Sequence, residues 1–279
     1  MTSVLFKLSV FSVFVTLSTT ISGQDDQFSW PGGAGAAVCL TYDDGMDTQL
    51  SNAIPDLDKH NLQGTFYLQG DLIPYERVDV WRELSRKGHE LGNHTAYHPC
   101  SEEFPWVWDE FQTETYTVRR MVKELQVMNY FLHAIDGKEN RSFAYACAET
   151  RVGGISYIDS LRHSGLFIGA RGGGPGIVED LQNLDIFNVP SWGVNLSVNA
   201  EDMIGFVKEA VRAEGLAVFM FHGIGGEYLY ITHEDHTLLI EYLDNNRDEI
   251  WVAPFGEVVK HIINERQRLG WKHLNGHNF

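Results

Sequence analysis

Two adjacent carboxylates, Asp43 and Asp44, follow an apolar run in the segment LTYDDG at residues 40–45. Carboxylates are costly to bury and like charges repel, so the pair needs either a cation or a solvated turn. An Asp before Gly45 also suits an ordinary tight turn, and the segment alone leaves that alternative open. Beside a cation the two carboxylates would have separate tasks, since one can coordinate while the other accepts a proton.

Two histidines are placed to bind such a cation, and a third lies at the end of another apolar run. His94 and His98 lie four residues apart in GNHTAYHP, a spacing that puts both imidazoles on one side of a helical turn. His222 follows the apolar run FMF. Two imidazoles and one carboxylate, with open positions for water and substrate, form a common catalytic metal set. The chain has 12 histidines, so chance spacings arise, and we expect a structural role for His60, His89, His133, His163, His261 and His273.

The segments TYDDG, HTAYHP and HGIG resemble, in this order, the signature motifs of the NodB-type polysaccharide deacetylases, the family 4 carbohydrate esterases. The likeness extends over residues 36–262. It implies a distorted (β/α) barrel in a single domain, which removes acetyl groups from sugars with one divalent metal ion. Zinc is the expected ion, with Co, Mn or Ni as alternatives.

The resemblance also implies a role for each candidate residue. It makes Asp44, His94 and His98 the metal ligands, Asp43 the catalytic base and His222 the general acid. The chemistry of these groups agrees, because a metal ion lowers the pKa of water and polarises a carbonyl, while a carboxylate beside it accepts the proton.

Two positions depart from the family pattern. Ala144 stands where the third motif usually offers an Arg that orients the base, and Ser191 stands where the fourth motif has an Asp before its Trp. We predict that Arg171, at the end of the run LFIGAR, replaces the missing Arg. This position shares the rim with the metal site, and Arg can hold a carboxylate with two hydrogen bonds. A surface Arg in a Gly-rich loop is the alternative.

Three further residues are expected to support the substrate. Trp192 resembles the Trp of the fourth motif, which shapes the pocket and backs the general acid, although packing in the core is an equally good interpretation. Ile224, in HGIG, resembles the apolar wall that holds the acetyl methyl group. Tyr145 is the aromatic residue in SFAYACAET, a stretch that the family places near the oxyanion.

Alternating strand and helix patterns must position these groups. Apolar runs predict strands at residues 36–42, 64–68, 90–93, 142–147, 166–170, 186–189, 216–221 and 250–255. Amphipathic patterns predict helices, most clearly at 200–214 after a cap at Asn199, and another at 110–131. This alternation favours an α/β fold, either a (β/α) barrel or a doubly wound sheet. A barrel would gather the candidate residues at the carboxyl ends of its strands.

The composition is that of an acidic globular protein. Lys and Arg number 21 against 38 Asp and Glu, a formal net charge of -17, so we expect no nucleic-acid partner and a poor fit to strongly anionic polymers. A hydrophobic content of 43% predicts a sizeable core. No linker divides the 279 residues, and we expect one catalytic domain at 24–279.

Residues 1–23 have the pattern of a secretory signal peptide, with Lys7 followed by an apolar run that ends in small residues. We therefore expect a secreted, periplasmic or extracellular protein with no stable membrane anchor after cleavage. An uncleaved anchor is the alternative, although the apolar run is short for a span.

Export would permit disulfide formation. Cys100 follows the second motif and Cys147 ends the predicted strand of the third, so both should reach the same rim and could pair beside the site. Cys39 would then be a buried free thiol. Three unpaired cysteines are the alternative.

The leading functional hypothesis is deacetylation of poly- or oligosaccharides that contain N-acetylglucosamine. An esterase acting on O-acetyl groups is the first alternative, because a metal site alone does not separate amide from ester. A carbohydrate-binding protein with little turnover is the second. The sequence sets neither the particular glycan nor the oligomeric state.

Overall fold

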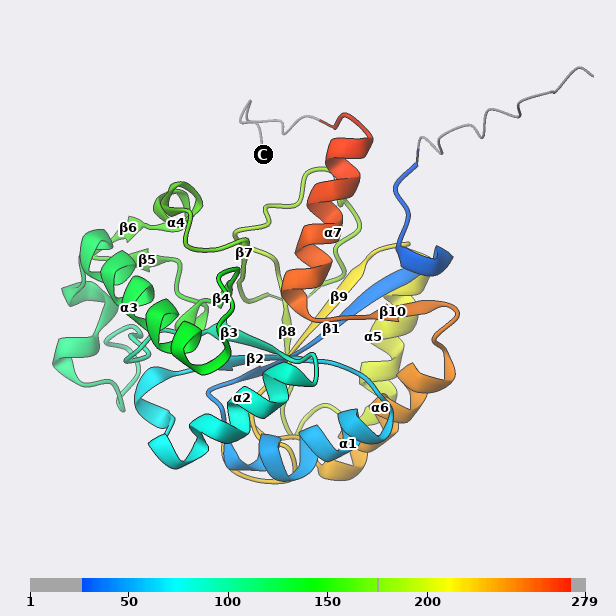
Figure 1. Ribbon diagram of the computed structural model, residues 1–279, viewed down its shortest axis with the longest axis horizontal. Helices are drawn as coiled ribbons and strands as arrows, with labels where there is room; N and C mark the ends of the chain where they lie inside the picture. Colours follow the sequence, from blue (N-terminus) through cyan, green and yellow to red (C-terminus); the bar gives the residue numbers. More distant parts are fainter. Residues whose placement is uncertain (1–26, 175, 272–279) are drawn as a thin grey trace, which may run out of the picture.

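A curled parallel sheet organises the protein (Figure 1). The computed structural model describes residues 27–174 and 176–271, so the predicted signal peptide lies outside the described residues. The strand order is β7-β4-β3-β2-β1-β9-β8, with β10 also paired to β1. Helix α7 lies on one side of the sheet and α1 and α2 lie on the other (Figure 1). The predicted fold, a distorted (β/α) barrel in one domain, is confirmed as a half-barrel.

The strands of the sheet are β1 (Ala36–Asp43), β2 (Thr65–Leu68), β3 (Glu90–Asn93), β4 (Ser142–Ala144), β7 (Gly169–Arg171), β8 (Trp192–Gly193), β9 (Leu216–Phe221) and β10 (Ile250–Val252). A separate antiparallel hairpin consists of β5 (Arg151–Val152) and β6 (Ile155–Ser156). The helices are α1 (Ile54–Lys59), α2 (Val78–Arg86), α3 (Val118–Asp136), α4 (Ile158–Ser164), α5 (Ala200–Arg212), α6 (His233–Asn245) and α7 (Phe255–Arg268). All pairings in the sheet are parallel, so the carboxyl ends of its strands lie at one edge.

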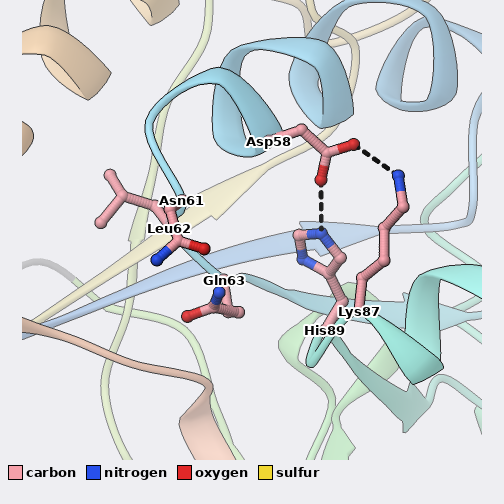
Figure 2. A pocket seen from close by; sticks show the side chains of 6 residues that line it. All are labelled: Asp58, Asn61, Leu62, Gln63, Lys87 and His89. Carbon is pink, nitrogen blue, oxygen red and sulfur yellow. Dashed lines mark hydrogen bonds and ion pairs between the residues drawn. The ribbon is translucent and has the colours of Figure 1, made fainter.

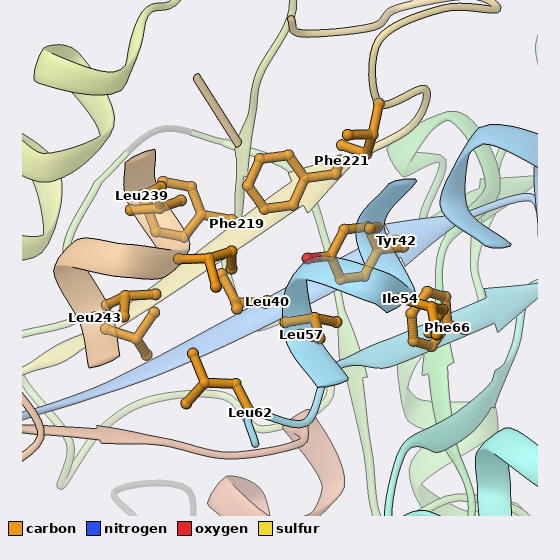
Figure 3. Packing of buried hydrophobic residues seen from close by; sticks show 14 of the residues in the cluster. Leu40, Tyr42, Ile54, Leu57, Leu62, Phe66, Phe219, Phe221, Leu239 and Leu243 are labelled. Carbon is orange, nitrogen blue, oxygen red and sulfur yellow. The ribbon is translucent and has the colours of Figure 1, made fainter. Parts of the chain in front are cut away.

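Strand β1 is buried along its whole length because both of its faces are covered. Leu40 and Tyr42 belong to one apolar cluster, to which α1 and α6 contribute side chains such as Leu57 and Leu239 (Figure 3). Cys39 faces the second cluster, to which α7 contributes, and it is the buried free thiol that we predicted. A continuous apolar run is what a parallel strand between two layers requires.

Three predicted strands have different ends in the structure. The strand expected at 142–147 stops at Ala144, because the chain then turns with Cys147 at a left-handed φ of 50°. The strand expected at 166–170 is displaced toward Arg171. The strand expected at 250–255 stops at Val252, because Pro254 has no N–H to donate to the sheet. Pro254 directly precedes α7, which begins at Phe255.

The strand predicted at 186–189 is not formed. Asp185 turns this segment, because its side chain accepts from the Phe187 amide at 2.9 Å and its carbonyl accepts from the Asn188 amide at 2.9 Å. Val189 makes an isolated bridge to Arg171, and the Ile186 carbonyl accepts from the Ala170 amide at 2.8 Å. Since β8 follows three residues later and pairs with β9, this stretch links the two outer strands of the half-barrel.

The two predicted helices differ in accuracy. Helix α5 begins at the predicted cap, where Asn199 and Asp202 exchange side-chain-to-backbone hydrogen bonds. Helix α3 begins at Val118 rather than residue 110, because Thr117 caps it by accepting from the Arg120 amide. Within residues 27–174 and 176–271, no helix is long and apolar enough to span a membrane.

A disulfide joins Cys100 to Cys147, as predicted, and ties the loop after β3 to the turn after β4. It closes a loop with a sequence separation of 47 residues. In the chain-entropy description, a Cys100→Ser/Cys147→Ser variant should lose about 4 kcal/mol in free energy of unfolding. Urea titration measures this loss, and wild-type protein unfolded with a thiol reductant is the matched control. Equal stability of variant and oxidised wild type would contradict the expectation.

Candidate active site

Asp43 ends β1, and Asp44 begins the turn that follows it. The Asp44 amide still donates to the Tyr67 carbonyl of β2 at 2.9 Å, so the strand pairing holds the turn in place. Asp44 and Gly45 adopt left-handed φ values of 75° and 71°. This conformation is costly for a residue other than Gly, and such strain concentrates at functional sites. Both carboxylates are only 2% exposed, so the pair is not a solvated turn.

His94 and His98 approach the Asp pair from the end of β3. The Nε2 atoms of His94 and His98 lie 3.5 Å and 3.6 Å from Asp44 Oδ1. The predicted helical turn between the two histidines is wrong, because Thr95 and His98 have left-handed φ values of 70° and 49°. The His98 amide donates to Thr95 Oγ1 at 2.7 Å and closes this tight turn. The imidazoles converge all the same.

The two imidazoles are neutral and offer a lone pair to the site. The Nδ1 atom of His94 donates to the Ala144 carbonyl at 2.9 Å, which leaves Nε2 as the unprotonated nitrogen. Burial lowers the pKa of His94 to about 4, although Asp43 opposes the shift. Burial, together with the neighbouring His94, lowers the pKa of His98 to about 4. Neutral imidazole is the form that binds a metal ion.

The side chains of Asp44, His94 and His98 fit a divalent ion. Their ligand atoms lie within 4.8 Å of one another. Asp44 Oδ1 is buried with no hydrogen-bond partner, and a cation would relieve that unfavourable state. Burial raises the pKa of Asp44, although His98 opposes the shift, so this carboxylate gains most from a cation beside it. Two imidazole nitrogens and one carboxylate oxygen are a donor set that suits zinc.

His222 and Tyr228 meet the second oxygen of Asp44. His222 follows β9, and its Nε2 atom lies 3.9 Å from Asp44 Oδ2. The Tyr228 hydroxyl donates to the same oxygen at 2.7 Å. The Gln49 side chain donates to the carbonyls of Asp43 at 2.5 Å and His222 at 3.1 Å. We did not predict Tyr228 or Gln49, since no motif marks them and Tyr228 lies 184 residues from Asp44 in the sequence.

Arg171 contacts Asp43. One terminal nitrogen of the guanidinium donates to Asp43 Oδ2 at 2.6 Å, and the other donates to Ser191 Oγ at 2.9 Å. Ser191 Oγ in turn donates to the Gly172 carbonyl at 2.6 Å. Burial alone would raise the pKa of Asp43, but the Arg171 guanidinium, with smaller contributions from the nearby imidazoles of His94 and His222, holds it below its ordinary value. Asp43 is therefore ionised at neutral pH.

Comparison with known proteins gives a family match for part of the chain. A family model described as polysaccharide deacetylase matches residues 32–153, which include the Asp pair and both ligand histidines. The peptidoglycan-N-acetylglucosamine deacetylase of Bacillus cereus is 38% identical over 65 residues, which are 23% of this chain and 23% of that protein. The chitooligosaccharide deacetylase of Sinorhizobium fredii is 36% identical over 69 residues, which are 24% of this chain and 32% of that protein. This part of the chain is therefore similar to the polysaccharide deacetylases, the family that the sequence motifs resemble.

The wider comparison extends the likeness beyond the matched segment. The aligned segments cover less than a third of either curated relative, 23% of the Bacillus cereus protein and 32% of the Sinorhizobium fredii protein. The structure of a family 4 acetyl xylan esterase from Clostridium thermocellum, in complex with a cobalt ion, superposes with a TM-score of 0.53. The two are 21% identical, and the match covers 80% of this chain and 90% of that chain. The family's fold therefore extends over most of the described residues.

The register of the sheet places Arg171 directly beside Ala144. Ala144 on β4 stands where the third motif has its Arg, and Arg171 is its direct partner on the neighbouring strand β7. The guanidinium therefore reaches Asp43 from β7 rather than from β4. We expected two hydrogen bonds from Arg171 to Asp43. The structure has one, and Ser191, which occupies the place of the fourth-motif Asp, takes the other.

Replacing Arg171 by Lys is expected to lower kcat on the order of a hundredfold, because an ammonium cannot hold Asp43 and Ser191 in one plane and a slightly misplaced base loses rate. Arg171→Ala should also lower the free energy of unfolding by about 3–5 kcal/mol, since it leaves a buried carboxylate without its cation. Steady-state rates and urea titration measure the two effects. The matched control is Arg162→Lys. Arg162 lies outside the site, and its guanidinium donates to Asp185 Oδ1 at 3.1 Å and to Asp185 Oδ2 at 3.0 Å. Normal turnover of both Arg171 variants would refute the role.

The three residues predicted to support the substrate lie in apolar surroundings. Trp192 packs its ring on Phe206 and Phe219, so packing accounts for its position and its predicted role toward His222 stays a prediction. Ile224 is fully buried in the first apolar cluster, and its role as a wall for the acetyl methyl group also stays a prediction. The Tyr145 hydroxyl donates to the Phe187 carbonyl at 2.8 Å in the second cluster, so its hydroxyl is engaged inside the core.

A cavity of about 310 Å³ lies away from the metal ligands, near the amino ends of β2 and β3 (Figure 2). Asp58 lies between the other charged groups of its lining, 2.7 Å from Lys87 Nζ and 3.7 Å from His89 Nε2. His89 Nδ1 accepts from the Gly64 amide at 3.2 Å, which agrees with the structural role predicted for this histidine. Polar groups at the amino end of such a sheet ordinarily serve stability, and we assign no chemistry to this cavity.

Proposed function

We propose that this protein is a metal-dependent hydrolase that removes acetyl groups from carbohydrate, with Asp43 as base and His222 as acid. The observation that carries the proposal is that each carboxylate has one oxygen in a hydrogen bond and one oxygen without a partner. Asp43 Oδ2 is held by Arg171 and Asp44 Oδ2 by Tyr228, whereas the Oδ1 atom of each is buried with no hydrogen-bond partner. Two supported carboxylates, each with one unused oxygen, suit one proton acceptor and one metal ligand.

Asp44, His94 and His98 would hold a divalent ion, which would lower the pKa of a water molecule and polarise the acetyl carbonyl. Asp43 Oδ1 accepts a proton from that water as its oxygen attacks the carbonyl carbon. Arg171 keeps Asp43 ionised and fixes its orientation. His222 donates a proton to the nitrogen or oxygen of the sugar as the bond to the acetyl group breaks.

N-acetyl groups are the substrate that we propose. Two curated relatives that match 65 and 69 residues of the chain are a peptidoglycan-N-acetylglucosamine deacetylase and a chitooligosaccharide deacetylase. The net charge of -17 favours neutral or cationic glycans over strongly anionic ones. Zinc is the ion that the donor set supports best, with Co, Mn or Ni as alternatives.

Acetate release by the zinc-reconstituted protein tests the proposal. The arms are chitooligosaccharide, peptidoglycan and acetylxylan, with the same protein after chelation as control. Release from the first two arms is the expected result. Release from acetylxylan alone would favour an O-acetyl esterase. Zinc binding without acetate release from any arm would favour a carbohydrate-binding protein and refute the enzyme assignment.

Export is part of the same proposal. The Cys100–Cys147 disulfide supports a protein that matures in an oxidising compartment. Detection of the protein outside the cell, with an amino terminus near residue 24, is the expected outcome.

A further inference from the structure

Three exposed aromatic side chains lie close together in the sequence between β3 and α3. Phe104, Trp106 and Trp108 are 38%, 55% and 70% exposed. The rings of Phe104 and Trp106 contact one another, with centroids 5.5 Å apart. Single exposed aromatics are common, but a contiguous apolar patch on a soluble protein marks a binding surface.

This aromatic patch, residues 104–108, borders the metal ligands. The Trp106 ring lies 5.9 Å from the His98 ring, measured between centroids and with an angle of 35° between their planes. The His98 side chain is 14% exposed, whereas the side chains of His94 and Asp44 are 2% and 3% exposed. His98 is thus the most exposed of the three ligands, and the patch adjoins it.

The loop that carries the patch is fixed at its ends. Cys100 is held by the disulfide to Cys147, and its carbonyl accepts from the Thr113 amide at 2.9 Å. Internal turns shorten the loop, since the Val107 amide donates to Phe104 at 3.1 Å and the Phe111 amide donates to Trp108 at 2.8 Å. A surface that is ordered before binding loses less entropy when its ligand arrives.

The charges around the patch select among ligands that stack on aromatic rings. Residues 101–111 include Glu102, Glu103, Asp109 and Glu110 and no Lys or Arg. Arg120 of α3 contacts this loop, where its side chain donates to the Glu110 carbonyl at 2.8 Å, so acidic groups still outnumber the cation. Single-stranded nucleic acids, which also stack on aromatic side chains, need a basic groove. The ring of a pyranose has an apolar C–H face and polar equatorial groups, so it can lie flat on an indole without any cation. The acidic setting suits a neutral sugar, or one that carries an amine.

We propose that Trp106 and Phe104 form a subsite that stacks a sugar ring adjoining the one whose acetyl group reacts, with Trp108 extending the surface. The ligand class is a neutral or partly deacetylated glycan of several residues, and the subsite makes the protein prefer such chains to single sugars. This inference rests on the proposed function for the position of the reacting sugar.

The experiment compares Trp106→Ala, Trp106→Phe and wild type, with Tyr130→Ala as matched control, because Tyr130 is a 64% exposed aromatic residue on α3. Calorimetry measures the Kd for chitopentaose, and steady-state kinetics measures kcat/KM for chitopentaose and for 4-nitrophenyl acetate. Trp106→Ala is expected to raise the Kd and to lower the ratio of the two kcat/KM values about two- to tenfold, the range of one aromatic stacking contact. Trp106→Phe should recover part of the loss, and Tyr130→Ala should match wild type.

The two readouts separate this inference from the proposed function. If wild type releases no acetate from any glycan but binds chitopentaose, and Trp106→Ala weakens that binding, the proposed function fails and the subsite stands. An unchanged Kd and an unchanged ratio in Trp106→Ala would overturn the subsite even in an active deacetylase. Absence of chitopentaose binding by wild type would overturn it as well.

Discussion

Asn in place of Asp43 is expected to lower kcat by about two to four orders of magnitude, the usual contribution of a general base, while the bound metal stays in place. An amide has nearly the shape of a carboxylate, so it can still accept from Arg171 at the Oδ2 position. It cannot take up the proton that the unpartnered Oδ1 atom would receive. Acetate release and elemental analysis of the same protein sample measure the two effects.

The outcome separates the two adjacent carboxylates. Asp159→Asn, on α4 and with a side chain 86% exposed, is the matched control and should change neither quantity. If Asp43→Asn loses its metal along with its rate, Asp43 is a ligand and the assignment of the pair must be reversed. If it retains the rate, another residue is the base.

Ala in place of His94 or His98 is expected to remove most of the metal and most of the activity. Two protein ligands hold a catalytic ion poorly. Loss of a residue that merely orients a ligand already costs about ten- to a hundredfold in affinity, so loss of a ligand should cost more. Zinc titration followed by elemental analysis measures the affinity, and acetate release at high zinc should recover part of the rate by mass action.

His133→Ala is the matched control for both variants, because His133 lies on α3 and its imidazole contacts the Lys138 carbonyl. It should keep the wild-type affinity and rate. Full occupancy in both the His94 and the His98 variant would contradict the ligand set. Loss in only one variant would limit the site to that histidine and Asp44.

Much of the site could be predicted because it lies at strand ends that the apolar runs mark. The apolar runs predict the carboxyl ends of β1, β3 and β9 to within one residue. Those ends carry Asp43, His94 and His222. Arg171 could be predicted for the same reason, although its strand is only three residues long and displaced. The parallel order of the sheet then brings these positions to one edge, whatever the loops between them do.

The remaining contacts depend on loop conformations that leave no periodic pattern in the sequence. Tyr228 and Gln49 reach the Asp pair through turns, and the link from Arg171 to Ser191 requires two segments to meet across the half-barrel. Helix α3 begins later than predicted, because two short 3-10 turns at Asp109–Phe111 and Thr113–Thr115 come first and Thr117 caps the true start. Contacts of this kind are set by tertiary packing rather than by local propensity.

The disulfide beside the site has a consequence for the order of maturation. The Nδ1 or Nε2 atom of His98 and the sulfur atoms of Cys100 and Cys147 lie within 4.8 Å of one another. Before oxidation, these three side chains offer zinc one nitrogen and two thiolates, a soft donor set. This set would compete for zinc with Asp44, His94 and His98. Formation of the disulfide removes both thiolates and with them this competing site. We therefore expect zinc added to the oxidised chain to bind at Asp44, His94 and His98, and zinc added to the reduced chain to bind in part at His98 and the two thiolates.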